Sequence, residues 1–175
     1  IVDLKNIDAW RRWLEKNHHQ DGAIWLVYYT KASGRVNFTW SEAVSVALCF
    51  GWIDSKIIKI DAHTTHQHFS KRKAKSTWSK INKDKVEQLI AAGLMAEAGY
   101  KSIEIAKQNG SWTSLDAVEN LEVPTDLEQA LRKNKKAQAN FSTLAKSKRK
   151  LLLYWLTSAK REETRRSRCP QELKN

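Results

Sequence analysis

The chain has 175 residues, of which 41% are hydrophobic and 29% are charged, and eight are tryptophans. This composition predicts one folded domain, or a domain with a small appendage, and argues against global disorder. No apolar run approaches the roughly 20 residues of a membrane-spanning helix, and the charges in the opening IVDLKNIDAW do not fit a secretory signal. Two cysteines are too few for a disulfide framework. We therefore expect a cytoplasmic protein.

The net charge of +12 is concentrated in two blocks of the sequence. Residues 71–90 hold 7 basic and 2 acidic side chains, and residues 131–175 hold 14 basic and 3 acidic side chains. Such blocks attract nucleic acid, anionic lipid head groups or acidic proteins. Each block could equally be a solvated face without a partner.

The first half of the chain predicts a small antiparallel sheet with two helices. The helices are expected over residues 6–18 and 39–50, and the strands over residues 23–31, 52–61 and 63–72. Thr39 and Glu42 form a capping box that begins the second helix, and Gly51 ends that helix. A turn near Asp61 joins the last two strands. The mixed hydrophobic pattern leaves the strand order open.

From Ser76 onward only helices are expected. Ser76 or Thr77 would cap a helix that carries Trp78 on its apolar face and ends at Gly93. Further helices are expected at residues 95–110, from a capping box of Thr125 and Glu128, at residues 137–144, and from Ser147 with Leu151, Leu152, Trp155 and Ala159 facing inward. The C-terminal helices are short and need partners to be stable.

These patterns predict the α+β fold class, with a small antiparallel sheet packed with helices in the N-terminal half and short helices only in the C-terminal half. We expect residues 1–93 to form the α+β part, and residues 94–175 to form a helical part packed on the first as one compact unit. A boundary within residues 110–124 is an alternative.

Four segments carry a resemblance to a known family: ALCFGWID, KSTWSKIN, LIAAGLMAEAG and RKLLLYWLTSAKREETR. In their order and spacing, the chain resembles the YdeI/OmpD-associated, OmdA-like family, also called the bacteriocin-protection family, from about residue 7 to residue 168. The resemblance implies a small bacterial protein linked to envelope stress and bacteriocin protection. It implies no catalytic residues, because the family has no agreed ones.

The first basic block is the main candidate for anion binding. Its candidate contacts surround Trp78 and are Lys71, Arg72, Lys73, Lys75 and Lys80. A helix that begins near Ser76 would add its positive end, and an exposed Trp78 could stack a base. Trp78 shares helical spacing with Ile81, however, so we predict that Trp78 lies in the core and that the cations stay outside.

The second candidate cluster follows the predicted last helix, and comprises Lys160, Arg161, Arg165, Arg166 and Arg168. Of these, Arg161, Arg165 and Arg166 are our predicted anion contacts. Glu162 and Glu163 can pair locally with the arginines three or four residues away. If the two basic clusters shared one face, they would form a stripe typical of nucleic-acid binders.

Two alternative functions remain open. One is a small-molecule or enzymatic cleft lined by Trp25, Trp52, Asp54 and Lys56, in which Asp54 could act as an acid or base. The commoner outcome for Asp54 is a pair with Arg72 or with a backbone N–H. The other is a protein-interaction module whose partner docks on an exposed face of the C-terminal helices between residues 151 and 155.

No motif supports a particular enzyme class. The chain has no nucleophile elbow, Walker loop or dinucleotide fingerprint. His63, His66 and His68 lack a nearby acid or thiol, so we predict no metal site and no cofactor. The sequence therefore predicts a non-enzymatic protein whose basic surface binds an anionic partner: nucleic acid, anionic lipid or an acidic protein.

Overall fold

The structure is a computed structural model that describes residues 1–159 and 161–171. These residues form a three-stranded antiparallel sheet and a series of helices, which confirms the α+β class. The chain divides into two compact units, residues 1–113 and residues 114–175. This division lies within the alternative boundary range of 110–124. Among the described helices, none is long and apolar enough to cross a membrane.

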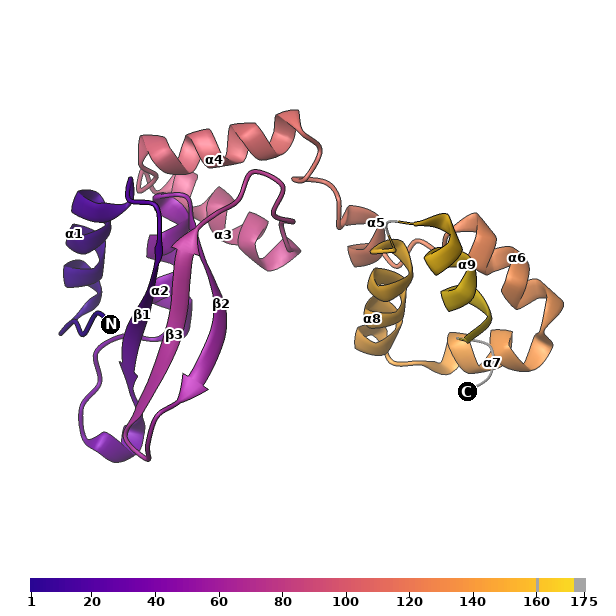
Figure 1. Ribbon diagram of the computed structural model, residues 1–175, viewed down its shortest axis with the longest axis horizontal. Helices are drawn as coiled ribbons and strands as arrows, with labels where there is room; N and C mark the ends of the chain where they lie inside the picture. Colours follow the sequence, from indigo (N-terminus) through magenta and orange to yellow (C-terminus); the bar gives the residue numbers. More distant parts are fainter. Residues whose placement is uncertain (160, 172–175) are drawn as a thin grey trace. The chain divides into compact units, whose positions relative to one another are not determined.

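The first unit holds the whole sheet, as Figure 1 shows. Its elements are α1 (Ile7–Asn17), β1 (Ala23–Tyr29), the short 3-10 helix η1 (Lys31–Ser33), α2 (Trp40–Cys49), β2 (Trp52–Lys59), β3 (Thr64–Lys71), α3 (Lys80–Ala91) and α4 (Glu97–Gln108). The strand order is β1-β3-β2, and both pairs are antiparallel. Asp61 closes the turn between β2 and β3, because its carboxylate accepts hydrogen bonds from the N–H groups of His63 and Thr64, both at 2.7 Å.

Helices α1 and α2 pack on one face of this sheet. Trp10 and Leu14 of α1, and Leu48 of α2, are fully buried in one cluster with Phe69 of β3. The indole N–H of Trp10 donates to the carbonyl of Ala43 at 3.1 Å, so its polar edge is satisfied inside the core. Burial of such side chains stabilises the unit by about 1.5–3 kcal/mol each.

The start of α2 confirms the predicted capping box. The Thr39 hydroxyl accepts from the Glu42 N–H at 3.2 Å, and the Glu42 carboxylate accepts from the Thr39 N–H at 2.7 Å. The start of α3 differs from the prediction, because its N-cap is Ser79, whose hydroxyl accepts from the Asn82 N–H. Trp78 therefore lies before α3 and not within it.

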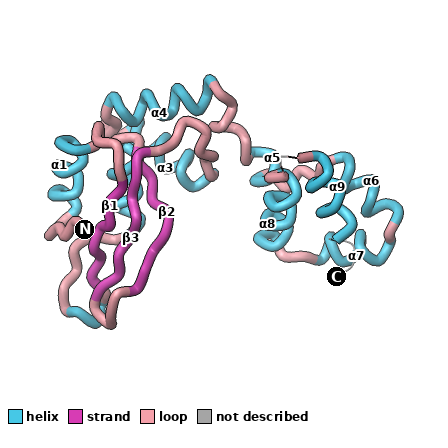
Figure 2. Tube along the Cα trace, viewed as in Figure 1, coloured by secondary structure: helices cyan, strands magenta, loops and turns pink. Residues whose placement is uncertain are grey.

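Trp78 is nevertheless in the core, as predicted, with 1% of its surface exposed. The reason given by the sequence pattern was wrong, since Ile81 of α3 is 62% exposed and shares no buried face with Trp78. The loop between β3 and α3, drawn in Figure 2, carries Trp78 into contact with Trp112 at a ring distance of 4.9 Å.

Helix α4 packs tightly against the end of α2, near the end of the sheet where β3 ends and β2 begins (Figure 1). At Gly99 a Cβ atom would lie 2.3 Å from the carbonyl oxygen of Cys49, so only glycine allows this approach. Gly51 ends α2 with φ +70°, as predicted, and a Cβ there would lie 3.0 Å from the Ala98 carbonyl oxygen. Two glycines thus bring α4 close to the junction between α2 and β2.

In the second unit, the described residues form helices and loops (Figure 2). Its elements are α5 (Asp116–Glu119), α6 (Thr125–Lys133), α7 (Lys135–Thr143), α8 (Lys146–Thr157) and α9 (Glu162–Gln171). Its core contains Leu127 and Leu131 of α6, and Leu153 and Leu156 of α8. This confirms that short helices follow the sheet-containing half.

Two details of the second unit correct the sequence analysis. The Thr125–Glu128 capping box is absent from the described α6, because Pro124 takes the N-cap position and Thr125 is already helical. Leu151 does not face inward but is 67% exposed. The run LLLYWL is apolar on every side of a helix, so its periodicity could not indicate which face would be buried.

Candidate functional site

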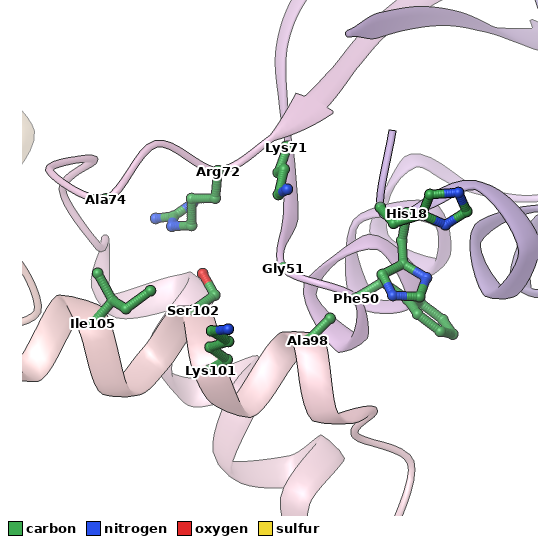
Figure 3. Close-up of a pocket in the computed structure, with 11 residues that line it drawn as sticks. His18, Phe50, Gly51, Lys71, Arg72, Ala74, Ala98, Lys101, Ser102 and Ile105 are labelled. Atoms are coloured by element: carbon green, nitrogen blue, oxygen red, sulfur yellow. The ribbon is translucent and has the colours of Figure 1, made fainter. Parts of the chain in front are cut away.

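A hollow of about 430 Å³ lies in the first unit beside the end of β3 and α4 (Figure 3). Its lining consists of His18, His19, Phe50, Gly51, Lys71, Arg72, Ala74, Ala98, Lys101, Ser102 and Ile105. We call this hollow the basic pocket. Three of these eleven described residues are Lys or Arg, two are His, and none is Asp or Glu.

Arg72 is held in place by three contacts. Its backbone N–H donates to the Gly51 carbonyl at 2.9 Å, and its guanidinium donates to the Thr77 carbonyl at 2.6 Å. The guanidinium also lies over the Trp78 ring, 3.7 Å from the centroid, in a cation–π contact. Its Nε is buried and has no hydrogen-bond partner among the described residues. These contacts hold the guanidinium against the core where it lines the hollow.

Burial lowers the pKa of Arg72 to about 10, and the negative charge of Asp54 partly opposes this shift. The side chain remains a cation at neutral pH. A partly buried cation is costly unless an anion or hydrogen bonds compensate it. The hydrogen bond to Thr77, the Trp78 ring and the charge of Asp54 compensate part of this cost, and a negatively charged ligand would compensate more of it.

Lys71 and Lys101 add positive charge from two different elements. Lys71 is the last residue of β3, and its Nζ lies 3.8 Å from the carboxylate of Asp21, whose side chain is 99% exposed. Such a pair is weak in water, so Lys71 is not neutralised. Lys101 and Ser102 belong to α4, with Ile105 one turn further along. Figure 3 shows all of these side chains around the same hollow.

His18 forms one wall of the basic pocket. It caps the C-terminus of α1, and its ring Nδ1 lies 2.9 Å from the Leu14 carbonyl oxygen. Since a carbonyl only accepts, Nδ1 carries the hydrogen and Nε2 is left for other contacts. The ring lies 5.5 Å from that of Phe50. The imidazole is thus fixed in orientation by its own helix.

The remaining cations of the first predicted cluster lie outside the pocket lining. Lys73 and Lys75 are exposed in the loop after β3. Lys80 begins α3 and pairs with Asp84 one turn later, with an Nζ–Oδ1 distance of 3.4 Å. The structure therefore brings two of the five predicted cations, Lys71 and Arg72, into the basic pocket.

The second predicted cluster lies in the second unit, and two of its members have carboxylate partners there. Arg165 binds Asp126 through two hydrogen bonds of 2.6 and 2.9 Å, and Arg166 pairs with Glu162. Arg161 is exposed, and Lys160 lies outside the described residues. The local pairing expected for Arg166 is confirmed, and Arg165 instead connects α9 with α6.

The residues predicted to line a cleft are not on one face of the sheet. Trp25 is paired with His68, whereas Asp54 is paired with Phe69, the next residue of β3. Because successive residues of a strand face opposite sides, Trp25 and Asp54 lie on opposite faces. Trp25 contacts the His68 ring edge-on at 5.1 Å. Lys56 is exposed, within the irregular part of β2.

Asp54 is satisfied by side chains and not by the partners that we expected. Its carboxylate accepts from the Trp40 indole at 2.8 Å and from the Gln67 amide at 3.1 Å. Trp52 is buried, and its indole donates to the carbonyl of His18 at 3.0 Å. These contacts give both residues roles in the fold.

The histidines of β3 do not come together with other metal-ligating side chains. His68 is bonded to the hydroxyl of Ser55, with Nδ1 and Oγ 2.9 Å apart. Throughout residues 1–159 and 161–171, no group of three or more His, Cys, Asp or Glu side chains is arranged to hold a metal ion.

The sequence analysis missed His18, His19, Lys101 and Ser102 as pocket residues. They are separated from Lys71 and Arg72 by 29 positions or more, so no local pattern connects them. The only local signal is Gly99, within the segment LIAAGLMAEAG, whose missing side chain permits the approach of α4.

Two protein-family models match separate parts of the chain, and each match lies within one of the two compact units. A family model described as Domain of unknown function (DUF8412) matches residues 2–102, which is more than half of the chain. The chain belongs to this family. Ten of the eleven pocket residues fall within the DUF8412 segment, and Ile105 follows it.

A second family model, described as Bacteriocin-protection, YdeI or OmpD-Associated, matches residues 120–171. This match confirms the family resemblance over residues 120–171, within the second unit, where the segment RKLLLYWLTSAKREETR lies. The other three segments of the resemblance lie within the DUF8412 match. Among curated proteins and among solved structures, none shows significant similarity to the chain.

Proposed function

We propose that this protein is a non-enzymatic binding protein, and that its basic pocket holds an anionic group of the partner. Nucleic acids, anionic lipid head groups and acidic proteins all carry such groups. One observation supports the proposal above others: Lys71, Arg72 and Lys101 line one hollow together with two histidines, and none of its described lining residues is acidic.

The shape and charge of the hollow favour an anion. Concave sites lined by charges of one sign concentrate the field and raise the local concentration of counter-ions. Hydrogen bonds between Lys or Arg and an anion are shorter and stronger than neutral ones. The first turn of α4 also lines the pocket with Ala98, and the N-terminal end of a helix carries partial positive charge.

The C-terminal family match associates the chain with bacteriocin protection. We propose that anion binding by the first unit serves a stress or envelope-protection role of this kind, in the cytoplasm. The cytoplasmic location is supported by Cys49, a buried free thiol, which is typical of a reducing compartment.

Binding measurements across salt concentrations test the proposal. The probes are a 5′-phosphorylated single-stranded oligonucleotide, vesicles with one-fifth anionic lipid, and a polyglutamate peptide, each titrated at about 50 and 200 mM salt. We expect at least one probe to bind at the lower salt and to weaken several-fold at the higher salt, because released counter-ions drive such binding.

Variants identify the site of this binding. The double variant Lys71→Ala and Lys101→Ala should bind at least tenfold more weakly than the wild type. Lys31→Ala, a charge loss in η1 outside the pocket lining, should bind like the wild type. Absence of binding by all three probes at low salt, or equal weakening by the two kinds of variant, would contradict the proposal.

One observation favours a second function, a protein-docking site on α8. Leu151 and Tyr154 are 67% and 46% exposed, beside a hollow of about 320 Å³ that Leu115 and Val118 also line. Exposed apolar residues that cluster around a hollow are typical of protein interaction sites. If a protein partner binds this surface, Leu151→Asp should prevent the complex that the partner forms with the wild-type chain. The same variant should leave anion binding by the basic pocket unchanged.

A further inference from the structure

We infer that the natural ligand of the basic pocket is a small organic phosphomonoester, whose phosphate contacts Lys71, Arg72 and Lys101 while its apolar or aromatic body lies against Ile105. This inference rests on the part of the proposed function that places an anionic group in the basic pocket, and it names a small molecule in place of a macromolecular partner.

The size of the pocket indicates an organic molecule and not a bare ion. A volume of about 430 Å³ would hold on the order of fourteen water molecules at ~30 Å³ each. It falls within the range of pockets that bind small organic ligands. An inorganic anion would fill a minor part of this space and would leave the apolar wall in contact with water.

The charge of the pocket indicates a dianion. Lys71, Arg72 and Lys101 are three cations around one hollow. A phosphomonoester carries a charge of about −1.5 to −2 at neutral pH and offers three acceptor oxygens. A single carboxylate would neutralise only one of the cations. The forked guanidinium of Arg72 and the two ammonium groups are the donors that phosphate oxygens prefer.

The non-polar lining indicates where the rest of the ligand lies. Phe50, Ala74, Ala98 and Ile105 line the same hollow as the cations, and Ile105 is partly exposed there. In Figure 3, Ile105 and Ala98 lie along α4, on the side opposite Arg72 and Lys71. Covering this wall with an apolar ligand group removes it from water, which favours binding.

Isothermal titration of the full chain with three small ligands tests the inference at about 50 mM salt. Phenyl phosphate has both the dianion and the ring, inorganic phosphate lacks the ring, and benzoate has the ring with a single charge. We expect phenyl phosphate to bind at least tenfold more tightly than either of the others. Equal affinity for phenyl phosphate and inorganic phosphate would overturn the assignment of an organic body.

Variants of the pocket distinguish the contribution of the phosphate to binding from that of the apolar body. Ile105→Ala should weaken phenyl phosphate binding about threefold or more and leave the affinity for inorganic phosphate unchanged. Lys71→Ala with Lys101→Ala should weaken both phosphates at least tenfold, whereas Lys31→Ala should weaken neither. Circular dichroism spectra that match the wild type establish that each variant is folded, and a variant that fails this check is replaced by Ile105→Val or Lys101→Gln.

The outcome also distinguishes this inference from the proposed function. If phenyl phosphate does not bind, while the phosphorylated oligonucleotide or the anionic vesicles bind in a salt-dependent way through Lys71 and Lys101, the pocket serves a macromolecule and the inference is wrong. If neither the small phosphates nor the large probes bind, both proposals are wrong.

Discussion

The guanidinium of Arg72 lies 3.7 Å from the centre of the Trp78 ring. This contact explains why a tryptophan occurs within a dense basic segment. Trp78 belongs to the core, with 1% of its surface exposed, and its ring face supports one of the cations that line the basic pocket. A core residue thus holds the Arg72 guanidinium in position at the basic pocket.

Trp78→Ala should remove a large part of the stability of the first unit. Truncation of a buried aromatic side chain costs about 3–5 kcal/mol, and the contact with Trp112 is lost as well. Urea unfolding monitored by circular dichroism measures the change. A loss below about 1 kcal/mol would show that Trp78 does not anchor the loop after β3.

Gly99→Ala should displace α4. The added Cβ would lie 2.3 Å from a backbone oxygen of Cys49, which cannot move aside as a side chain would. Overpacking of this kind costs about 1–3 kcal/mol, and anion binding should weaken because Lys101 moves with α4. Calorimetric melting and titration with phenyl phosphate measure the two effects.

Gly34→Ala is the matched control for this variant. Gly34 has a left-handed backbone, with φ +68°, whereas Gly99 is helical, and nothing lies within 4 Å of the Cβ added at Gly34. It should therefore cost only about 1 kcal/mol of backbone strain and leave anion binding intact. If the two glycine variants behaved alike, the packing of α4 would not position the pocket.

Tyr28→Phe should leave the protein as stable as before, or make it more stable by up to ~2 kcal/mol. The Tyr28 hydroxyl is buried without a hydrogen-bond partner among the described residues, and an unsatisfied buried hydroxyl is unfavourable. Thermal melting at neutral pH measures the change. A clear loss of stability would reveal a partner for the hydroxyl, such as a buried water.

The stability difference between Tyr28→Phe and the wild type should depend on pH. Burial, and to a lesser extent the charge of Asp54, raises the pKa of Tyr28 above its ordinary range. Its contribution to stability is present below the pKa of an unfolded tyrosine, near 10, and is lost as the pH rises above that value. The stability advantage of Tyr28→Phe should therefore increase between pH 9 and pH 11.

The Arg165–Asp126 pair should stabilise the second unit only where Asp126 is ionised. The bidentate hydrogen bonds from Arg165 are the main cause of the lowered pKa of Asp126. A lowered carboxyl pKa contributes stability above the unfolded value, near 4, and loses it as the pH falls below that value.

Arg165→Gln should therefore destabilise the second unit by about 0.5–1 kcal/mol at pH 7, since both side chains are partly exposed. The effect should vanish near pH 2. Arg166→Gln is the control, because its partner Glu162 is four residues away on the same exposed helix face, and its loss should be smaller. A loss from Arg165→Gln that did not depend on pH would refute the charge pairing.

Most of the first unit's fold could be predicted because its signals are local. The Thr39–Glu42 capping box, Gly51 and the Asp61 turn each act within a few residues, and the structure contains all three. The errors occurred where local signals were ambiguous. The start of α3 had several possible caps between Ser76 and Ser79, and the local pattern did not distinguish them.

The basic pocket could be predicted only in part, for the same reason. Lys71 and Arg72 belong to a charge cluster that is visible in the sequence. His18 follows α1 and Lys101 lies within α4, so their position beside that cluster depends on how helices pack on the sheet. The close packing of α4 against the end of α2, which Gly99 permits, cannot be inferred from the hydrophobic periodicity of a single sequence.

The most direct test of the account is a nuclear magnetic resonance titration of the full chain with phenyl phosphate, observed through backbone amides and imidazole ¹⁵N signals. If the pocket binds the phosphate, saturable shifts should occur at Gly51, Arg72, Ser102 and the His18 ring, and the Lys71→Ala and Lys101→Ala double variant should abolish them. Saturable shifts that instead cluster around Arg161 and Lys146, or that are absent at every residue of the basic pocket, would contradict it.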